Sequence, residues 1–336
     1  MSEIGAVPRA GDGRRGLRHA LKALSVVFSA ALLVILYRSL DVRGVGVALR
    51  AAAPWWLALA VGLILPITLL RALRFKWIMP SGGVASVAEA VRITLVASAL
   101  NVFLPAKTGD FAKSLIVTRR GGASGGASAA IVVYERLSDT ACMIFWGILG
   151  VLVARPNLPL LPSATWSVFA GLGIVCSVLI LSVRAATLLT VLPTRLLGPR
   201  RAPWLSSLVA AWPALLVSLQ GRRIALALFS VFLWLVQLLQ VWLFAVALSA
   251  DISFAVCASV SSIALIVGQI PGTLSGIGAR DMTLVLLLSA YIAPEKAAAL
   301  GILTATRTLV PALLALPTLR YYLGVMVEGE TRDTAG

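Results

Sequence analysis

Apolar runs separated by short polar stretches dominate the pattern of the chain. A helix that spans a membrane needs about 20 mostly apolar residues. Runs of that length predict spans near residues 21–40, 54–73, 126–153, 164–183, 224–248 and 299–320. Two more apolar stretches, at residues 84–118 and 252–291, are interrupted in the middle by proline, glycine and charged residues. These stretches predict two broken or re-entrant helix segments.

The pattern as a whole predicts an all-α, polytopic integral membrane bundle of about six to eight spans, because only helices and closed barrels satisfy the backbone in lipid. The composition agrees, since 60% of the 336 residues are hydrophobic and 12% are charged. We expect a single transmembrane domain over residues 21–325. A disordered basic cytoplasmic tail, residues 1–20, is expected before it, and a C-terminal tail, residues 326–336, after it.

The basic residues predict the orientation in the membrane. The net charge is +16, but the Arg and Lys residues lie mainly in short connections between apolar runs, as the cytoplasmic loops of membrane proteins require. No basic stripe with interleaved aromatics indicates nucleic-acid binding. We expect an inner-membrane protein with both termini in the cytoplasm and a cytoplasmic interfacial region at residues 184–223. Residues 38–53 oppose this scheme, because their three arginines fall on the outer side.

The two interrupted segments resemble each other. "NVFLPAKTGDFAKSLIV" at residues 101–117 and "QIPGTLSGIGARDMTLVLL" at residues 269–287 each contain an apolar-proline step, a glycine, a basic and an acidic residue, and a new apolar run. In the expected topology the first segment enters from the cytoplasmic side and the second from the outer side. This is the arrangement of inverted repeats in transporters.

A helix that restarts after a break points free N–H groups and a positive dipole end into the gap. Lys107, Lys113 and Arg280 lie near these restarts, so the breaks favour an anion such as a phosphate. Asp110 and Asp281 fall in the first turns of the restarted helices, where we expect them to act as caps.

Charges also interrupt the long apolar runs. An ionisable side chain at mid-membrane costs about 2.5 to 3.5 kcal/mol on insertion scales, so it faces a partner or a wet cavity. "YERLSDT" places Glu135 and Asp139 four residues apart on one helical face, with Arg136 beside them. These carboxylates have two open interpretations: they bind a cation or a proton, or they form structural ion pairs with Arg74, Arg92 or Arg307.

Arg307 lies alone in the middle of the last apolar run, among Thr304, Thr306 and Thr308. A buried arginine needs a counter-ion. Either a carboxylate supplies it permanently or an anionic substrate supplies it transiently. Metal and cofactor binding have no support, because the one histidine, His19, lies in the N-terminal tail and the three cysteines fall in apolar segments without a ligand spacing.

Four motifs, "RALRFKWIM", "NVFLPAKTGDFAKSLIV", "YERLSDT" and "IPGTLSGIGARD", resemble the transmembrane region of lysylphosphatidylglycerol synthases and the wider flippase-like family of stand-alone membrane proteins. The resemblance runs over most of the chain. It implies an all-helical inner-membrane protein that moves an anionic or modified phospholipid, or a lipid-linked sugar, between leaflets. The implied site residues are Asn101, Pro105, Gly109, Asp110, Lys113, Glu135, Arg136, Asp139, Pro271, Gly276, Gly278, Arg280 and Asp281.

The chain departs from the family pattern at two of these positions. The family commonly has Glu after the first glycine and Arg three residues later, where this chain has Asp110 and Lys113. Lysine binds phosphate as a point charge and lacks the bidentate fork of arginine. The resemblance therefore implies a weaker grip on phosphate at Lys113.

The preferred hypothesis is a lipid translocase in which Arg74, Lys107, Lys113, Arg280 and Arg307 accompany an anionic headgroup. The alternative is a membrane-embedded transferase, or an accessory subunit of a lipid-modifying or glycolipid-synthesising enzyme, with a carboxylate as general base. No donor-binding motif supports that enzyme. A scaffold that presents residues 184–223 to a partner, such as a lipid-modifying enzyme, is the third hypothesis.

Overall fold

The structure is a computed structural model. It describes residues 41–79, 83–104, 108–154, 163–185, 203–269, 276 and 278–333, with four single positions before residue 41. All regular elements in these ranges are helical, which confirms the predicted all-α fold. The first predicted span apart from those four positions, the basic tail, Pro105, Lys107 and Pro271 lie outside the described residues.

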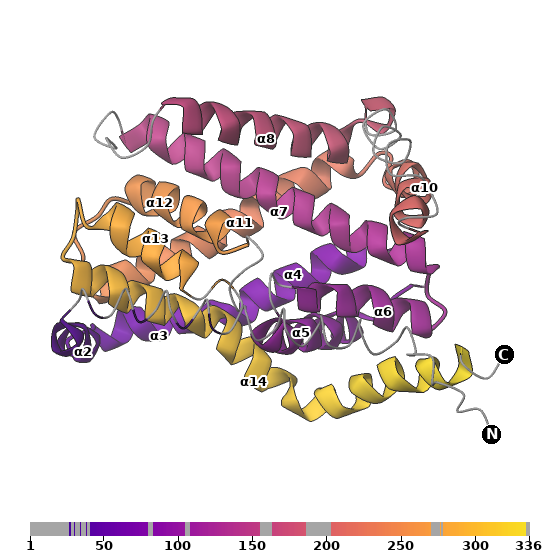
Figure 1. Ribbon diagram of the computed structural model, residues 1–336, viewed down its shortest axis with the longest axis horizontal. Helices are drawn as coiled ribbons and strands as arrows, with labels where there is room; N and C mark the ends of the chain where they lie inside the picture. The colour runs from indigo at the N-terminus through magenta and orange to yellow at the C-terminus, as the bar shows by residue number, and fades with distance from the viewer. Residues whose placement is uncertain are drawn as a thin grey trace, which may run out of the picture.

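The chain forms a bundle of long helices with shorter ones packed against them (Figure 1). The helices are α2 (Val42–Arg50), α3 (Pro54–Gly62), α4 (Ile64–Ile78), α5 (Val87–Phe103), the 3-10 turn η1 (Thr108–Asp110), α6 (Phe111–Arg119), α7 (Gly125–Ala154), α8 (Ser163–Leu181), α10 (Pro203–Ser218), α11 (Arg223–Ala247), α12 (Phe254–Val267), α13 (Ala279–Leu288) and α14 (Pro294–Asp333).

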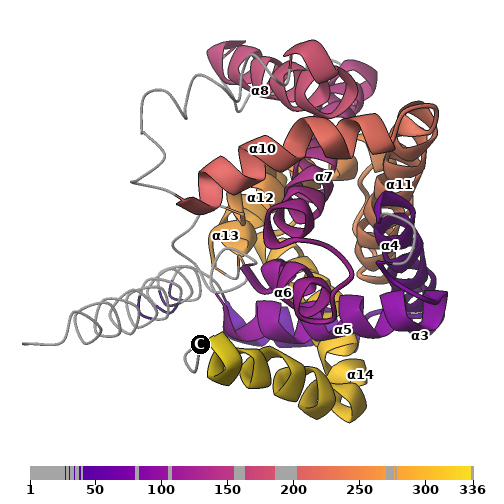
Figure 2. The ribbon, with the colours of Figure 1, turned by 90° about the vertical axis from the view of Figure 1, so that its right-hand side faces the viewer.

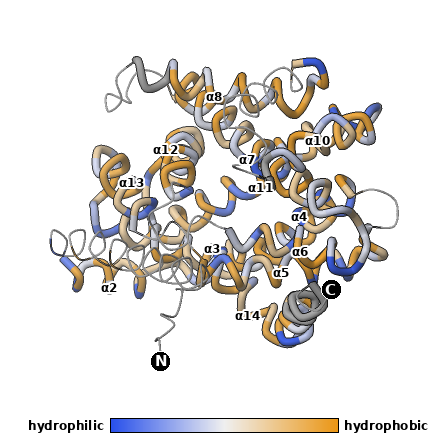
Figure 3. The backbone as a smooth tube through the Cα atoms, turned by 45° about the vertical axis from the view of Figure 1, so that its right-hand side comes forward, coloured by the Kyte–Doolittle hydropathy of each residue, from blue (hydrophilic) through white to orange (hydrophobic). Residues whose placement is uncertain are grey.

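Several helices are long and apolar enough to cross a membrane. Among the described residues these are Pro54–Ile78, Gly125–Ala154, Arg223–Ala247 and Pro294–Met326. The first combines α3 and α4. Hydrophobic residues dominate the long helices (Figure 3), and large apolar side chains such as Leu65, Leu152 and Leu313 are exposed on the outside of the bundle. The protein is thus a polytopic membrane bundle, in agreement with the predicted spans at 54–73, 126–153, 224–248 and 299–320.

The two interrupted segments form helical hairpins that turn back inside the bundle. The first is α5–η1–α6 and the second is α12–α13. Figure 1 shows α5 and α6 in one half of the molecule and α12 and α13 in the other. Helix α10 lies across one end of the bundle (Figure 2), where its Trp212 side chain donates to the carbonyl oxygen of Leu179 at 3.3 Å.

The two largest apolar cores lie toward opposite ends of the bundle. One gathers residues of α2, α3, α11, α12, α13 and the start of α14, including Phe244 and Leu288. The other gathers residues of α4, α5, α6, the start of α7 and α10, including Phe75 and Leu216. A third, smaller apolar cluster of α7, α11 and α12, which includes Trp234 and Leu265, lies next to the polar and charged side chains in the middle of the bundle.

Helices α7 and α12 approach closely through small residues. A β-carbon at Gly150 would lie 2.3 Å from the Oγ atom of Ser259 and 2.6 Å from the carbonyl oxygen of Ala255. Small residues at such contacts let helix backbones pack tightly in membranes. The second hairpin is therefore held against α7 by a contact that has no space for a larger side chain.

The Gly150→Ala substitution tests this contact. We expect it to lower stability by about 1 to 3 kcal/mol, as overpacked sites do, and to lower the thermal midpoint of the protein in detergent. Gly171→Ala is the matched control, because the β-carbon at this helical position meets no atom within 4 Å. An equal midpoint for the two variants would contradict the proposed close packing.

Candidate functional site

A polar cavity of about 80 Å³ lies in the middle of the bundle. A water molecule needs about 10 to 15 Å³ of such volume, so the cavity has room for water. Both broken segments contribute to its lining, the first through Asn101 and Asp110 and the second through Gly268, Gly276 and Arg280. The two breaks therefore meet at one site.

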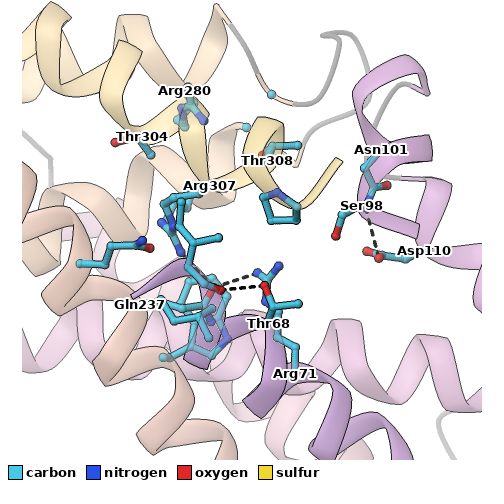
Figure 4. Close-up of a pocket in the computed structure, with 18 of the residues that line it drawn as sticks. Thr68, Arg71, Ser98, Asn101, Asp110, Gln237, Arg280, Thr304, Arg307 and Thr308 are labelled. Atoms are coloured by element: carbon cyan, nitrogen blue, oxygen red, sulfur yellow. Dashed lines mark hydrogen bonds between the residues drawn. The ribbon is translucent and has the colours of Figure 1, made fainter. Parts of the chain in front are cut away.

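The remaining polar lining comes from the long helices. Figure 4 shows Arg71 of α4, Gln237 of α11 and Arg307 of α14 converging on the cavity. Of the residues that the sequence suggested, the ones that line the cavity are Asn101, Asp110, Arg136, Gly276, Arg280 and Arg307. Arg74, Lys113, Glu135 and Asp139 form a buried network outside that lining.

The network begins with Arg74, which is 2% exposed. Its Nη1 atom lies 2.7 Å from Oδ1 of Asp139, and its Nη2 atom lies 3.7 Å from Oε1 of Glu135. Lys113 approaches the other oxygen of Glu135 at 3.0 Å. The indole N–H of Trp234 donates to Asp139 at 2.9 Å. Both carboxylates of "YERLSDT" are thus held by cations and donors.

Arg136 connects this network to the first break. Its Nη2 atom lies 2.9 Å from Oδ2 of Asp139 and 3.1 Å from Oδ2 of Asp110. The side-chain amide of Asn101 donates to Oδ1 of Asp110 at 3.2 Å. Asp110 makes no capping hydrogen bond to α6, which differs from the expected cap, because its oxygens face Asn101 and Arg136.

The geometry decides between the interpretations that the sequence left open for Glu135 and Asp139. Both carboxylates form ion pairs, and their partner among the three arginines considered is Arg74. Lys113, expected beside an anion, instead pairs with Glu135 and lies 5.0 Å from the ring centroid of Phe75. Arg74, Lys113 and Arg136 balance Asp110, Glu135 and Asp139 in charge.

Glycines make the first break possible. A β-carbon at Gly109 would lie 2.5 Å from the backbone nitrogen of Asn101. Only glycine allows η1 to approach the end of α5 this closely. The contact holds Asp110 beside Asn101.

The second break is shaped by Gly276 and Gly278, whose φ angles of +79° and +95° favour glycine. Asp281 accepts a hydrogen bond from the backbone N–H of Gly278 at 3.2 Å, as the expected cap of α13. Its other oxygen pairs with Arg280 at 2.6 Å. Arg280 also donates to the carbonyl oxygen of Gly301 at 3.2 Å, so this arginine has a carboxylate of its own.

Arg71 and Arg307 differ from the other interior cations. Both donate to the same neutral oxygen, Oε1 of Gln237, at 2.8 and 2.9 Å. Among the described residues, no carboxylate forms an ion pair with either arginine. Two positive charges therefore face the cavity with only an amide dipole between them.

Sequence reasoning missed Arg71 and Gln237 as site residues. Arg71 directly follows an apolar run, a position that is also typical of the basic residues in cytoplasmic connections. A helical spacing signal was nevertheless present, because Thr68 and Arg71 are three residues apart, as are Gln237 and Gln240. All four line the cavity. Polar residues at such spacing within a span share a helix face.

The apolar exterior and the charged interior cavity define a polytopic membrane protein with an internal polar site. The profile of the family described as "Lysylphosphatidylglycerol synthase TM region" matches residues 22–315, and the chain belongs to this family. A search of curated proteins returned no match. Family membership gives the protein a membrane-lipid context.

The buried network predicts a large cost for losing one carboxylate. Asp139→Asn leaves Arg74 and Arg136 short of negative charge, and we expect a loss of about 3 to 5 kcal/mol, typical of a broken buried pair. Denaturant unfolding in detergent micelles measures this loss. Glu89→Gln is the control, because its partner Arg120 is partly exposed, and such pairs contribute about 0 to 1 kcal/mol. Similar losses in both variants would refute the structural role of the network.

Proposed function

We propose that the protein is a lipid translocase, which moves an anionic or modified phospholipid, or a lipid-linked sugar, across the inner membrane. The headgroup passes through the central cavity while the acyl chains stay in lipid. One observation carries this proposal: Arg71 and Arg307 face the cavity where both helix breaks meet, without a carboxylate partner among the described residues.

The energetics of the membrane support this route. A charged group costs several kcal/mol in the hydrocarbon core unless it meets a partner or water. A wet cavity lined by arginines lowers that cost for a phosphate, because the guanidinium fork matches phosphate oxygens in a bidentate manner. An acyl chain gains nothing by leaving the lipid for this polar cavity, so it stays in the bilayer.

The opposed hairpins support movement between the two sides. In transporters built this way, discontinuous helices from two opposed units form a central site, and rocking of one unit opens it to each side in turn. Here α5–η1–α6 and α12–α13 both reach the cavity. Each hairpin is thus suited to control access from one leaflet.

The charge distribution supports the expected orientation. Basic residues gather where α4 and α6 end and where α11 begins, at Lys76, Arg119, Arg120, Arg222 and Arg223. Short cytoplasmic connections carry such an excess of Arg and Lys. We therefore assign these helix ends to the cytoplasm, where a lipid-modifying enzyme is a suitable partner.

Transfer chemistry has less support from the interior carboxylates. A general base must reach the proton that it removes. Asp110, Glu135 and Asp139 each contact cationic side chains. We therefore favour translocation over the transferase alternative.

The Arg307→Gln variant tests the proposal in proteoliposomes that contain fluorescent phospholipids or polyprenyl-phosphate sugars. Losing a charged hydrogen bond costs about 1.5 to 3 kcal/mol, so we expect headgroup movement to slow by roughly 10-fold to 100-fold. Arg320→Gln is the control, because Arg320 lies exposed on the same helix. Headgroup movement by the unmodified protein no faster than in empty vesicles, for every lipid tried, would overturn the proposal.

A further inference from the structure

We propose that the cavity binds a phosphate monoester with two negative charges, carried at the end of a lipid, in preference to a phosphodiester or a cationic aminoacylated lipid. This inference names the headgroup for the translocase proposed above. It rests on the proposed function in one respect, namely that the ligand is a lipid.

The charge balance around the cavity carries the inference. Among the described side chains of the cavity and its network, six are cationic and four are carboxylates. The cations are Arg71, Arg74, Lys113, Arg136, Arg280 and Arg307, and the carboxylates are Asp110, Glu135, Asp139 and Asp281. These described side chains therefore carry an excess of two positive charges.

This excess is concentrated at one place. Arg71 and Arg280 both repel the charge of Arg307. Asp139 and Asp110 attract Arg71 at longer range, but each is already paired with Arg136. A ligand with two negative charges balances this pair of arginines, whereas a ligand with one leaves a buried charge uncompensated.

Unpaired hydrogen-bonding atoms point to the same ligand. Gln237 is fully buried, and its Nε2 atom lacks a partner, as do Nη1 of Arg307 and Nε of Arg136. These are donors, and all three residues line the cavity. The unpaired acceptor among the described lining residues is Oδ1 of Asn101. This atom packs against Gly109, since a β-carbon added to that glycine would lie 2.7 Å from it. The residues that line the cavity thus carry several donor groups that lack a protein partner among the described residues.

An ammonium group has no matching site here. The four carboxylates around the cavity already contact arginines or Lys113. A lysyl headgroup would place its amino groups beside Arg71 and Arg307, where like charges repel. Leaving a charge without a counter-charge in the interior costs several kcal/mol. The family name therefore does not describe the headgroup that this cavity fits.

The size of the cavity agrees with a small headgroup. A volume of about 80 Å³ has room for a few waters. A terminal phosphate can replace them. A headgroup that carries glycerol and lysine has many more non-hydrogen atoms and needs more room than a terminal phosphate.

Lipid binding by the purified full-length protein in neutral detergent micelles tests the inference. The probes are phosphatidic acid, a monoester, phosphatidylglycerol, a diester, and lysylphosphatidylglycerol, each titrated by calorimetry. At about pH 8 the monoester carries close to two charges, because its second pKa is near 6. We expect phosphatidic acid to bind at least about tenfold more tightly than either other lipid.

Acidification provides an internal comparison. At about pH 5 a phosphate monoester carries one charge, and we expect most of its advantage over phosphatidylglycerol to disappear. Arg71→Gln and Arg307→Gln should also remove the advantage, while Arg320→Gln keeps it. Equal or tighter binding of phosphatidylglycerol or lysylphosphatidylglycerol at pH 8 would overturn the inference.

Inorganic phosphate separates a lipid site from a site for free phosphate. If the cargo is a lipid, phosphate alone binds far more weakly than phosphatidic acid and competes with it. Equal affinity for both would overturn the lipid assignment. Selective binding of phosphatidic acid without any headgroup movement in proteoliposomes would leave the inferred ligand standing and remove the translocase function, so the two proposals fail separately.

Discussion

The need to balance charge in a water-poor interior governs this structure. Three carboxylates at the centre are surrounded by Arg74, Lys113 and Arg136 at ion-pair distances, and Asp281 holds Arg280. Removing such charges from water costs several kcal/mol per ion, which only close partners offset. The first helix break and Gly109 place Asp110 beside Arg136 and Asn101, and the second break places Asp281 beside Arg280.

The sequence predicted the features that depend on local pattern. The length of the apolar runs predicted the spans. Proline, glycine and charged residues within two of these runs predicted the two helix breaks. The four-residue spacing of Glu135 and Asp139 placed them on one face of α7. The shared pattern of the segments predicted two opposed hairpins. Each of these features is set within one element or one short connection, where sequence pattern carries the information.

The partners of the charges were harder to predict, because they depend on how distant helices pack. Arg74 pairs with both Glu135 and Asp139 of α7 because α4 and α7 both pack on α11. Lys113 reaches Glu135 because α6 packs on α7. Arg71 was not predicted as a site residue. A single arginine after an apolar run has the same sequence context whether it lies in a cytoplasmic connection or lines a cavity. Nothing in the sequence indicated that Gln237 would lie between Arg71 and Arg307.

In the proposed translocase, the shared oxygen of Gln237 has a consequence for turnover. An amide oxygen carries only a partial charge, so an incoming anion exchanges a weak contact for a strong one without first separating a full ion pair. When the anion leaves, the amide oxygen again accepts hydrogen bonds from both arginines. This contact reduces the repulsion between their two positive charges. A neutral side chain of this kind lets the site empty and refill repeatedly, whereas a carboxylate in its place would compete with every cargo.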